Sequence, residues 1–256
     1  MKLDIRRYEI LNLIEKFGEV KITDLANRFG VTEMTIRRDI NRLSSLGFIK
    51  AVRGGAENKI NNENLLFNIT LRGRNIDHIE GKKKIGARAA EFIKENQFIF
   101  IQGGTTTMEL AKKMPRDINF TVITDSNPIA SIIGQYNNIN TVCTGGIYNR
   151  FSETFHGSHA EALIGDIKID TLFMGASGVS VNSNLTEFDF NISSLKKKII
   201  EVSNIKILLA DSHKFFIERH VAFGKIEDFN ILITDKDISP DIHSALINKK
   251  IKIVLV

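Results

Sequence analysis

The pentapeptide GGTTT, residues 103–107, combines residue types that can bind a phosphate group. Its glycines allow close backbone approach, and its hydroxyls and the free N–H groups of a following helix can donate to an oxyanion. A tight turn followed by a helix N-cap would also explain these five residues taken alone. The pattern predicts an oxyanion site made of Gly103, Gly104, Thr105, Thr106 and Thr107.

Four more small or polar segments follow short apolar runs farther along the chain: DSN at 125–127, GG at 145–146, GASG at 175–178 and DSHK at 211–214. In open α/β sheets the ligand crevice lies outside the carboxyl ends of the strands, so we expect these segments to converge on one pocket. The residues expected to line it are Asp125, Ser126, Gly145, Gly146, Asp211 and Lys214. Two alternatives stay open, because Asp211 can cap the following turn and Lys214 can be an ordinary surface charge.

The elements that would position this pocket are short apolar runs alternating with amphipathic helical segments. The runs are 98–102, 120–124, 140–144, 170–175, 205–210, 230–234 and 251–256. Helices are expected between most of them, at 108–114, 127–136, 158–167 and 190–203. The fold class is therefore α/β, with a mostly parallel sheet covered by helices on both faces.

Several other kinds of site are disfavoured by the sequence. Neither the P-loop pattern nor the dinucleotide-binding glycine pattern occurs, which argues against ATP and NAD and favours a smaller phosphorylated ligand. His156, His159 and His213 lack metal-site spacing, so we expect neither a metal nor a cofactor. Cys143 is the single cysteine and is expected to be a small buried hydrophobic residue. The two KKK runs, 82–84 and 196–198, are expected to be solvated.

A second kind of chemistry is indicated by the segment 31–50, which predicts a helix with two unlike faces. Ile36, Ile40, Leu43 and Gly47 fall on one side, with Asp39 on the flank. The opposite arc contains no acidic residue and consists of Met34, Thr35, Arg37, Arg38, Asn41, Arg42 and Ser45. A solvated helix face is the alternative, but such faces usually mix charges of both signs.

The residues before and after this helix predict a winged helix-turn-helix. An apolar stripe of Ile10, Leu13, Ile14 and Phe17 indicates a helix over 4–17. The segment TDLANRFG indicates a second helix, and only Gly30, Val31 and Thr32 separate it from the third, with Thr32 as the expected N-cap. After the third helix, FIKAVRGGAE predicts a hairpin with Arg53 near its tip. The second helix of a helix-turn-helix can enter the DNA major groove.

The charge distribution agrees with this division of the 256 residues. Residues 1–56 hold 11 Lys and Arg against 7 Asp and Glu, a net charge of +4, whereas the remaining 200 hold 24 against 23, a net of +1. A basic first unit fits contact with a polyanion. We expect a DNA-binding domain at 1–57 with its helix-turn-helix at about 20–39, a linker at 58–81 and an α/β domain at 82–256. No apolar stretch has membrane-spanning length and no signal peptide is recognisable, so a cytoplasmic location is expected.

The stretch RRYEILNLIEKFGEVKITDLANRFGVTEMTIRRDINRLSSLGFIKAVRGGA resembles the N-terminal domain of the DeoR family of bacterial transcriptional regulators. The segments GKKKIGARAAEFI, GGTTT, TDS, TGG, DTLFMGASGV, LTEFDFNISSLKKKII and LLADSHKF resemble that family's C-terminal sensor domain. The resemblance implies a sensor fold like that of ribose-5-phosphate isomerase and glucosamine-6-phosphate deaminase, with a phosphorylated sugar as effector. The sequence differs from the family's usual pattern at Asn184 and at Asn191–Ser193, and more mildly at Thr32, Ile40 and Lys50.

The same resemblance implies that Thr35, Arg37 and Arg38 contact DNA. Contacts are also expected from Thr32, Asn41 and Arg42 of the same helix and from Arg53 at the hairpin tip. Lys196 joins Asp211 and Lys214 as a residue expected to contact the phosphate or the sugar hydroxyls. The predicted function is a DNA-binding regulator that represses sugar metabolism genes as a homo-oligomer on a double-stranded operator and is released by a phosphorylated sugar. The alternative is a sugar-phosphate isomerase or deaminase, for which Asp211 and Glu187 are the candidate bases.

Overall fold

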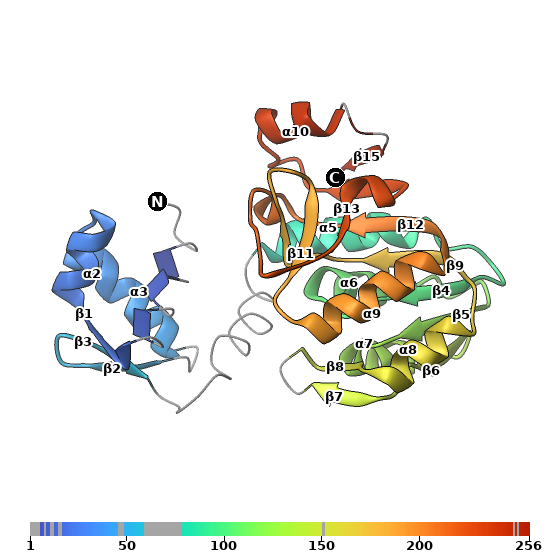
Figure 1. The fold of residues 1–256 in the computed structure, drawn as a ribbon, viewed down its shortest axis with the longest axis horizontal. Helices are drawn as coiled ribbons and strands as arrows, with labels where there is room; N and C mark the ends of the chain where they lie inside the picture. Colours follow the sequence, from blue (N-terminus) through green and yellow to red (C-terminus); the bar gives the residue numbers. More distant parts are fainter. Residues whose placement is uncertain are drawn as a thin grey trace. The chain divides into compact units, whose positions relative to one another are not determined.

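The structure is a computed structural model that describes residues 6–7, 9–10, 13–14, 17–45, 49–58, 78–149, 152–247, 249 and 251–256. The chain divides into two compact units, Met1–Ile76 and Asp77–Val256. Figure 1 labels helices and strands of both units.

The first unit contains the predicted helix-turn-helix and its hairpin. Helix α2 (Ile22–Phe29) ends at Gly30, whose φ of 62° is the left-handed conformation that glycine adopts at low cost, and helix α3 (Glu33–Ser45) follows at once. Strands β2 (Ile49–Val52) and β3 (Gly55–Asn58) pair antiparallel through a two-residue turn at Arg53–Gly54. The sequence did not predict a third strand, β1 (Glu19–Lys21), which pairs with β3.

The core of the first unit joins the predicted apolar faces. Ile10 and Ile14 pack with Leu25, Ile36 and Ile40 in one buried cluster. The described residues of the predicted 4–17 helix are helical, but the assignment of Phe17 to the buried stripe was wrong, since its side chain is 61% exposed. Phe17 occupies the last helical position before Gly18, where the chain turns away with a φ of 79°. Gly47 lies outside the described residues.

The second unit is built on a seven-stranded parallel sheet, which confirms the predicted α/β class. Its strand order is β15-β14-β12-β9-β4-β5-β6, and all seven predicted runs form these strands. In chain order they are β4 (Phe98–Ile101), β5 (Phe120–Thr124), β6 (Ile139–Cys143), β9 (Ile169–Met174), β12 (Ser203–Leu209), β14 (Ile231–Thr234) and β15 (Lys252–Leu255).

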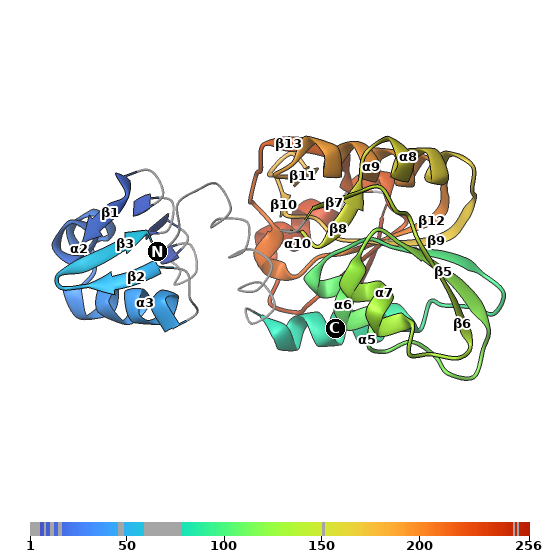
Figure 2. The ribbon, with the colours of Figure 1, turned by 90° about the horizontal axis from the view of Figure 1, so that it is seen from below.

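Helices cover both faces of the sheet (Figures 1 and 2). One face packs on α5 (Ile79–Ala90), α6 (Thr105–Ala111) and α7 (Asn127–Ile133), and the other on α8 (Ser158–Gly165), α9 (Phe190–Glu201) and α10 (Pro240–Ile247). Along β4, Ile99 and Ile101 belong to the first core and Phe100 to the second, as the alternation of strand side chains requires. The first turn of α5 occupies 79–81, which the sequence had assigned to the linker.

The order of strands creates a switch point between β4 and β9. The chain runs outward from β4 through β5 to β6, and then returns to place β9 on the other side of β4. Ligands of open α/β sheets bind outside the carboxyl ends of the strands at such a point. The GGTTT and GASG segments both begin there, GGTTT one residue after β4 and GASG directly after β9.

Two small antiparallel sheets were not predicted from the sequence. One is the hairpin of β7 (Ile147–Asn149) and β8 (Thr154–His156). The other joins β10 (Gly178–Val179), β11 (Asn184–Glu187) and β13 (Val221–Lys225). Strands this short carry no recognisable alternation, so pairing with distant segments decides their conformation.

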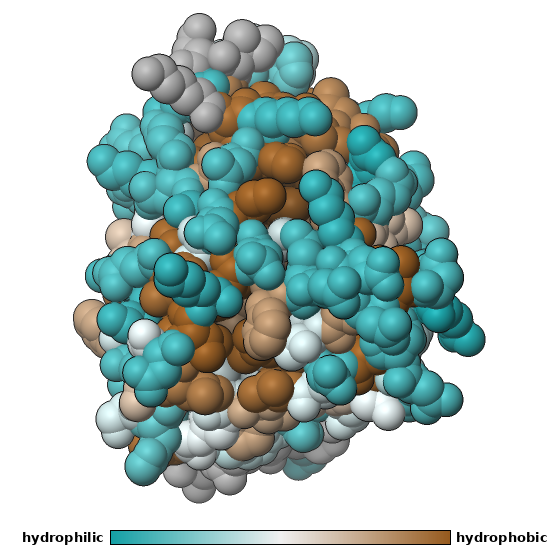
Figure 3. Space-filling model, turned by 90° about the vertical axis from the view of Figure 1, so that its right-hand side faces the viewer, coloured by the Kyte–Doolittle hydropathy of each residue, from teal (hydrophilic) through white to brown (hydrophobic). Residues whose placement is uncertain are grey.

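The surface of the second unit is not uniformly polar. Figure 3 shows apolar side chains lying between hydrophilic ones on one face of the molecule. None of the helices in the described part of the chain is long and apolar enough to cross a membrane.

Candidate functional site

Helix α3 buries one face and exposes a cationic one, as predicted. Ile36, Ile40 and Leu43 are at most 3% exposed. The side chains of Arg37, Arg38, Asn41 and Arg42 are exposed on the other side. Because the apolar face is fixed in the core, the guanidinium groups are held on the surface of a rigid element.

The first turn of α3 is capped by Thr32, in agreement with the sequence. The backbone N–H of Thr35 donates to Thr32 Oγ1 at 3.3 Å, and the two threonine hydroxyls lie 3.0 Å apart. Glu33 lies one turn before Arg37 and approaches its guanidinium at 3.5 Å, so the expectation that this face contains no acidic residue was wrong. This exposed pair orients Arg37 along the helix.

The hairpin places Arg53 where the sequence predicted it. Arg53 is exposed in the turn between β2 and β3, and Gly54 beside it has a φ of 84°. Lys50 and Glu57 form a cross-strand ion pair at 2.7 Å. The hairpin tip therefore presents one arginine next to the glycine that forms the turn.

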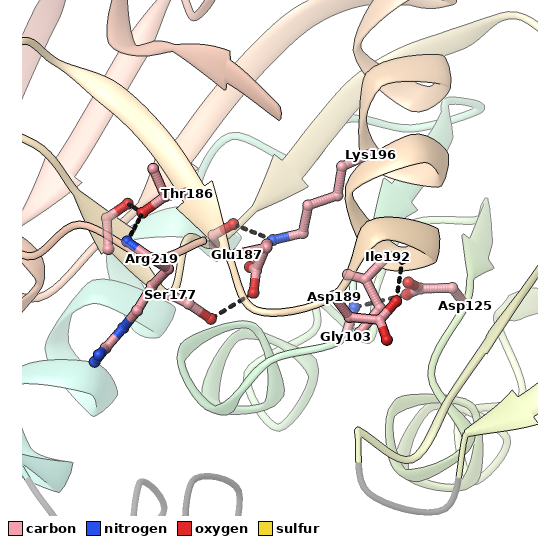
Figure 4. Close-up of polar contacts among 11 residues, drawn as sticks. Gly103, Asp125, Ser177, Thr186, Glu187, Asp189, Ile192, Lys196 and Arg219 are labelled. Atoms are coloured by element: carbon pink, nitrogen blue, oxygen red, sulfur yellow. Dashed lines mark hydrogen bonds and ion pairs between the residues drawn. The ribbon is translucent and has the colours of Figure 1, made fainter. Parts of the chain in front are cut away.

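In the second unit, Gly103 and Asp125 connect the ends of β4 and β5. The N–H of Gly103 donates to Asp125 Oδ1 at 2.7 Å (Figure 4). Burial raises the pKa of Asp125 to about 6, although the Gly103 N–H and the Lys196 charge act in the opposite direction. A Cβ atom on Gly103 would lie 2.4 Å from Thr154 Cγ2, so close packing alone requires glycine here.

The three threonines of GGTTT form the first turn of α6 rather than a loop. Thr105 and Thr106 are 7% exposed, and Thr107 is fully buried and donates from its Oγ1 to the Gly104 carbonyl at 2.9 Å. The helix thus begins three residues earlier than the sequence predicted. The Thr107 hydroxyl already donates its hydrogen bond within the turn. Thr105 and Thr106 are the threonines of this segment that lie nearer the surface.

The glycines that follow β6 are required by the backbone. Gly145 and Gly146 have φ values of 63° and 106°, and a Cβ on Gly146 would lie 2.6 Å from the carbonyl oxygen of His156. They turn the chain into the β7–β8 hairpin, whose Thr154 forms a bridge with Ser126. The GG segment therefore shapes this edge of the site by its conformation.

Lys196 is buried, so the expectation that its KKK run is solvated was wrong for this residue. Its side chain is 2% exposed, and Nζ donates to the Gly175 carbonyl at 2.8 Å and pairs with Glu187 (Figure 4). Ser177 Oγ donates to the other carboxylate oxygen of Glu187. The folding of β11 against α9 brings the partner carboxylate to the lysine. Glu187 is thus engaged by both a cation and a hydroxyl.

Lys82 is the second lysine whose predicted exposure was wrong. It is 2% exposed and contributes its charge, together with that of Lys214, to the surroundings of Asp211. Burial alone would raise the pKa of Asp211, but Lys214 and Lys82 outweigh it and hold the pKa below its ordinary value. The carboxylate is ionised at neutral pH. The sequence missed Lys82 as a member of this group.

Asp211 does cap the turn that follows it, which confirms the alternative left open from the sequence. Its Oδ1 accepts from the His213 N–H at 3.2 Å, at the start of the short 3-10 helix Ser212–Lys214. The imidazole of His213 stacks on that of His78 with ring centroids 3.2 Å apart. Lys214 itself is half-buried.

Four buried polar atoms at the carboxyl ends of strands of the large sheet have no hydrogen-bond partner in the described part of the chain. They are Gln102 Oε1 after β4, Thr144 Oγ1 after β6, Asp211 Oδ2 after β12 and Thr234 Oγ1 at the last residue of β14. A buried acceptor without a partner costs about 1–3 kcal/mol, so such atoms indicate a place for water or for a polar ligand. Gln102 and Thr144 were not predicted from the sequence, because an isolated Gln or Thr gives no pattern.

Among the described residues no group of three His, Cys, Asp or Glu could hold a metal ion. Cys143 is exposed on β6, so the expectation that it is buried was wrong. The reason is that β6 is the last strand of the sheet, a position that its apolar sequence does not reveal.

Comparison with known proteins decides the family. Residues 6–61 match the model of the DeoR-like helix-turn-helix domain, and residues 77–236 match the model of the DeoR C terminal sensor domain. The chain belongs to the DeoR family. It is a DNA-binding transcriptional regulator, and the main sequence-based prediction is confirmed over the isomerase alternative.

Individual relatives of this DeoR-family chain are similar along nearly their whole length. YulB of Bacillus subtilis, an uncharacterized HTH-type transcriptional regulator, is 31% identical over 98% of this chain and 96% of its own. The HTH-type transcriptional repressor CsqR of Escherichia coli is 28% identical over 98% of this chain and 94% of its own.

Among solved structures, the ribose 5-phosphate isomerase A of Methanocaldococcus jannaschii aligns over 52% of this chain and 53% of its own. Its TM-score is 0.39, and the sequence identity is 17%.

Proposed function

We propose that this regulator is a cytoplasmic repressor of sugar metabolism genes that leaves its operator when a phosphorylated sugar binds the second unit. The residues assigned to operator contact are Thr32, Thr35, Arg37, Arg38, Asn41, Arg42 and Arg53. Those assigned to the effector are Gly103, Gly104, Thr105, Thr106, Thr107, Asp125, Ser126, Gly145, Gly146, Lys196, Asp211 and Lys214.

The assignment of the operator contacts is supported by the exposed face of α3. Arginine suits bidentate contact with guanine or phosphate, and here Arg37, Arg38 and Arg42 are exposed on a helix whose other side is buried. Two recognition helices in successive major grooves need two copies of the chain, so the functional form is a homo-oligomer.

The effector assignment depends above all on the unpartnered acceptors of Gln102, Thr144 and Asp211 at the carboxyl ends of three strands. Sugar hydroxyls can donate to such acceptors. Lys82 and Lys214 beside Asp211 supply positive charge for a phosphate. Lys196 Nζ already pairs with Glu187, so its assigned part in effector binding is indirect. It adds positive charge near Asp125 and positions the Glu187 carboxylate.

The names of relatives support sugar control but differ in the direction of regulation. One relative is the Lactose phosphotransferase system repressor of Streptococcus mutans, 29% identical over 92% of this chain. Another is the L-fucose operon activator of Haemophilus influenzae, 29% identical over 91%. Repression is proposed here, with release by linkage: the effector must bind the DNA-free state more tightly, and about 1–3 kcal/mol of coupling suffices.

We further propose that the second unit is not a catalyst. A general base must be able to reach a substrate proton, and Glu187 is instead engaged by Lys196 and Ser177. Asp211 is ionised, and because its Oδ1 caps the following turn, its Oδ2 is the oxygen left to accept from a sugar hydroxyl. Incubation with ribose 5-phosphate or glucosamine 6-phosphate is expected to give no isomerised or deaminated product, and measurable turnover would overturn this part of the proposal.

The experiment that tests the function combines two titrations on the full chain. A thermal-shift screen of phosphorylated sugars identifies any compound that binds the native state, because such a ligand raises the melting temperature by mass action. Fluorescence anisotropy with DNA from upstream of the chain's own gene then measures operator affinity with and without that compound. A hit that weakens DNA binding is the expected result. A hit that strengthens binding, or a screen without hits, would contradict the proposal.

A further inference from the structure

Strand β6 leaves one side of its backbone open. Among the described residues it pairs only with β5, and it forms one end of the seven-stranded sheet. The Thr144 N–H donates to the Thr124 carbonyl at 3.0 Å, on the β5 side. Because successive backbone groups of a strand point to alternate sides, the N–H and C=O groups of Thr141 and Cys143 point away from β5.

This open edge lacks the charges that usually protect one. No Asp, Glu, Lys, Arg or His occurs from Ser126 to Asn149, although 25% of the chain is charged. Val142 is 38% exposed and Cys143 is exposed as well. Edge strands of monomeric proteins normally carry charged residues, above all Lys, which prevent pairing with other chains. The opposite edge follows this rule, since β15 carries the exposed Lys252.

We propose that β6 pairs antiparallel with β6 of a second copy of this chain across a two-fold axis, joining the two sheets into one. Antiparallel pairing of identical edges is self-complementary, and a two-fold interface places the same patch on both copies. The absence of charge means that the edge does not repel its own copy. No residue of β6 itself is assigned to the operator or to the effector, so the pairing stands independently of the proposed effector.

Sedimentation velocity on the full chain, without DNA or effector, tests this pairing. Val142→Lys adds a like charge to the edge of each copy, and Cys143→Pro removes an N–H that points only to the open edge. Each change is expected to weaken self-association at least about tenfold. Ile205→Lys is the matched control, because Ile205 is 40% exposed but lies on β12, which pairs with a strand on each side. This variant should associate like the natural chain. Equal association of all four folded proteins would overturn the proposal.

Hydrogen exchange on the unaltered chain gives a test that does not depend on the folding of any variant. Paired amides exchange slowly, whereas those on an open edge exchange quickly. We expect the amides of Thr141 and Cys143 to be protected at concentrations where the chain self-associates and to lose protection on dilution. Fast exchange of both amides in the associated form would mean that the copies meet elsewhere, and a chain that stays monomeric would also refute the pairing.

Discussion

Arg6 Nε donates to Asp39 Oδ2 at 2.6 Å, and both side chains are buried, at 6% and 1% exposure. Arg7 Nε donates to the other carboxylate oxygen of Asp39 at 2.8 Å. The acid of the TIRRDI segment thus connects α3 to the first helical segment. It holds the recognition helix in place, while the two arginines before it stay on the surface.

Loss of this carboxylate should destabilise the first unit. Asp39→Ala leaves the buried guanidinium of Arg6 without its partner, which typically costs about 3–5 kcal/mol. Urea unfolding followed by circular dichroism would measure the change. Asp24→Ala, which removes an exposed acid from α2, is the control and should stay within about 0.5 kcal/mol of the natural chain. Similar unfolding midpoints for the two variants would show that the buried pair is not important for stability.

Removal of the exposed arginines should weaken operator binding without affecting the fold. Arg37→Ala and Arg38→Ala are each expected to cost about 1–3 kcal/mol of binding free energy. Where the lost contact is to phosphate, the slope of log affinity against log salt should also fall by about one. Anisotropy titrations at several salt concentrations give both quantities. Lys168→Ala removes an equal charge from the surface of the second unit and should leave affinity and slope unchanged.

Lys214 should separate effector response from DNA binding. Lys214→Ala removes a cation beside the ionised Asp211, so the phosphorylated sugar should bind at least about tenfold more weakly. Operator affinity in the absence of effector should not change. If the identified compound, at the concentration that acts on the natural chain, still releases this variant from DNA, the effector binds elsewhere in the molecule.

Asp125 should give stability a distinctive pH dependence. Burial raises its folded-state pKa to about 6, above its ordinary value of 3.8, so between these values the folded state binds more protons than the unfolded state. This component of stability is therefore present below about pH 4 and is lost as the pH rises through 6. Asp125→Asn keeps an acceptor for the Gly103 N–H but cannot ionise.

The free energy of unfolding of Asp125→Asn, relative to that of the natural chain, should therefore increase as the pH rises from 4 to 7, by on the order of 2–3 kcal/mol. Unfolding free energies of both proteins across this range give the difference directly, and subtraction removes the opposing contributions of Asp211 and Glu227, whose pKa values are lowered. A difference that does not change with pH would mean that Asp125 titrates normally.

The sequence alone determined the features that depend on local periodicity and on turn chemistry. The spacing of Ile36, Ile40 and Leu43 was sufficient to predict which face of α3 is buried, and short apolar runs were sufficient to locate all seven strands of the large sheet. Both features repeat within a few residues, so neighbouring positions carry the information.

Only the tertiary structure decided the environment of single polar and apolar residues. Lys82 and Lys196 stand in runs that predict solvated lysines, yet both are buried, and Glu187 reaches Lys196 through the packing of β11 near α9. Cys143 is exposed because β6 ends the sheet. Burial and pairing depend on segments far apart in the sequence, and no local pattern records which of them will meet.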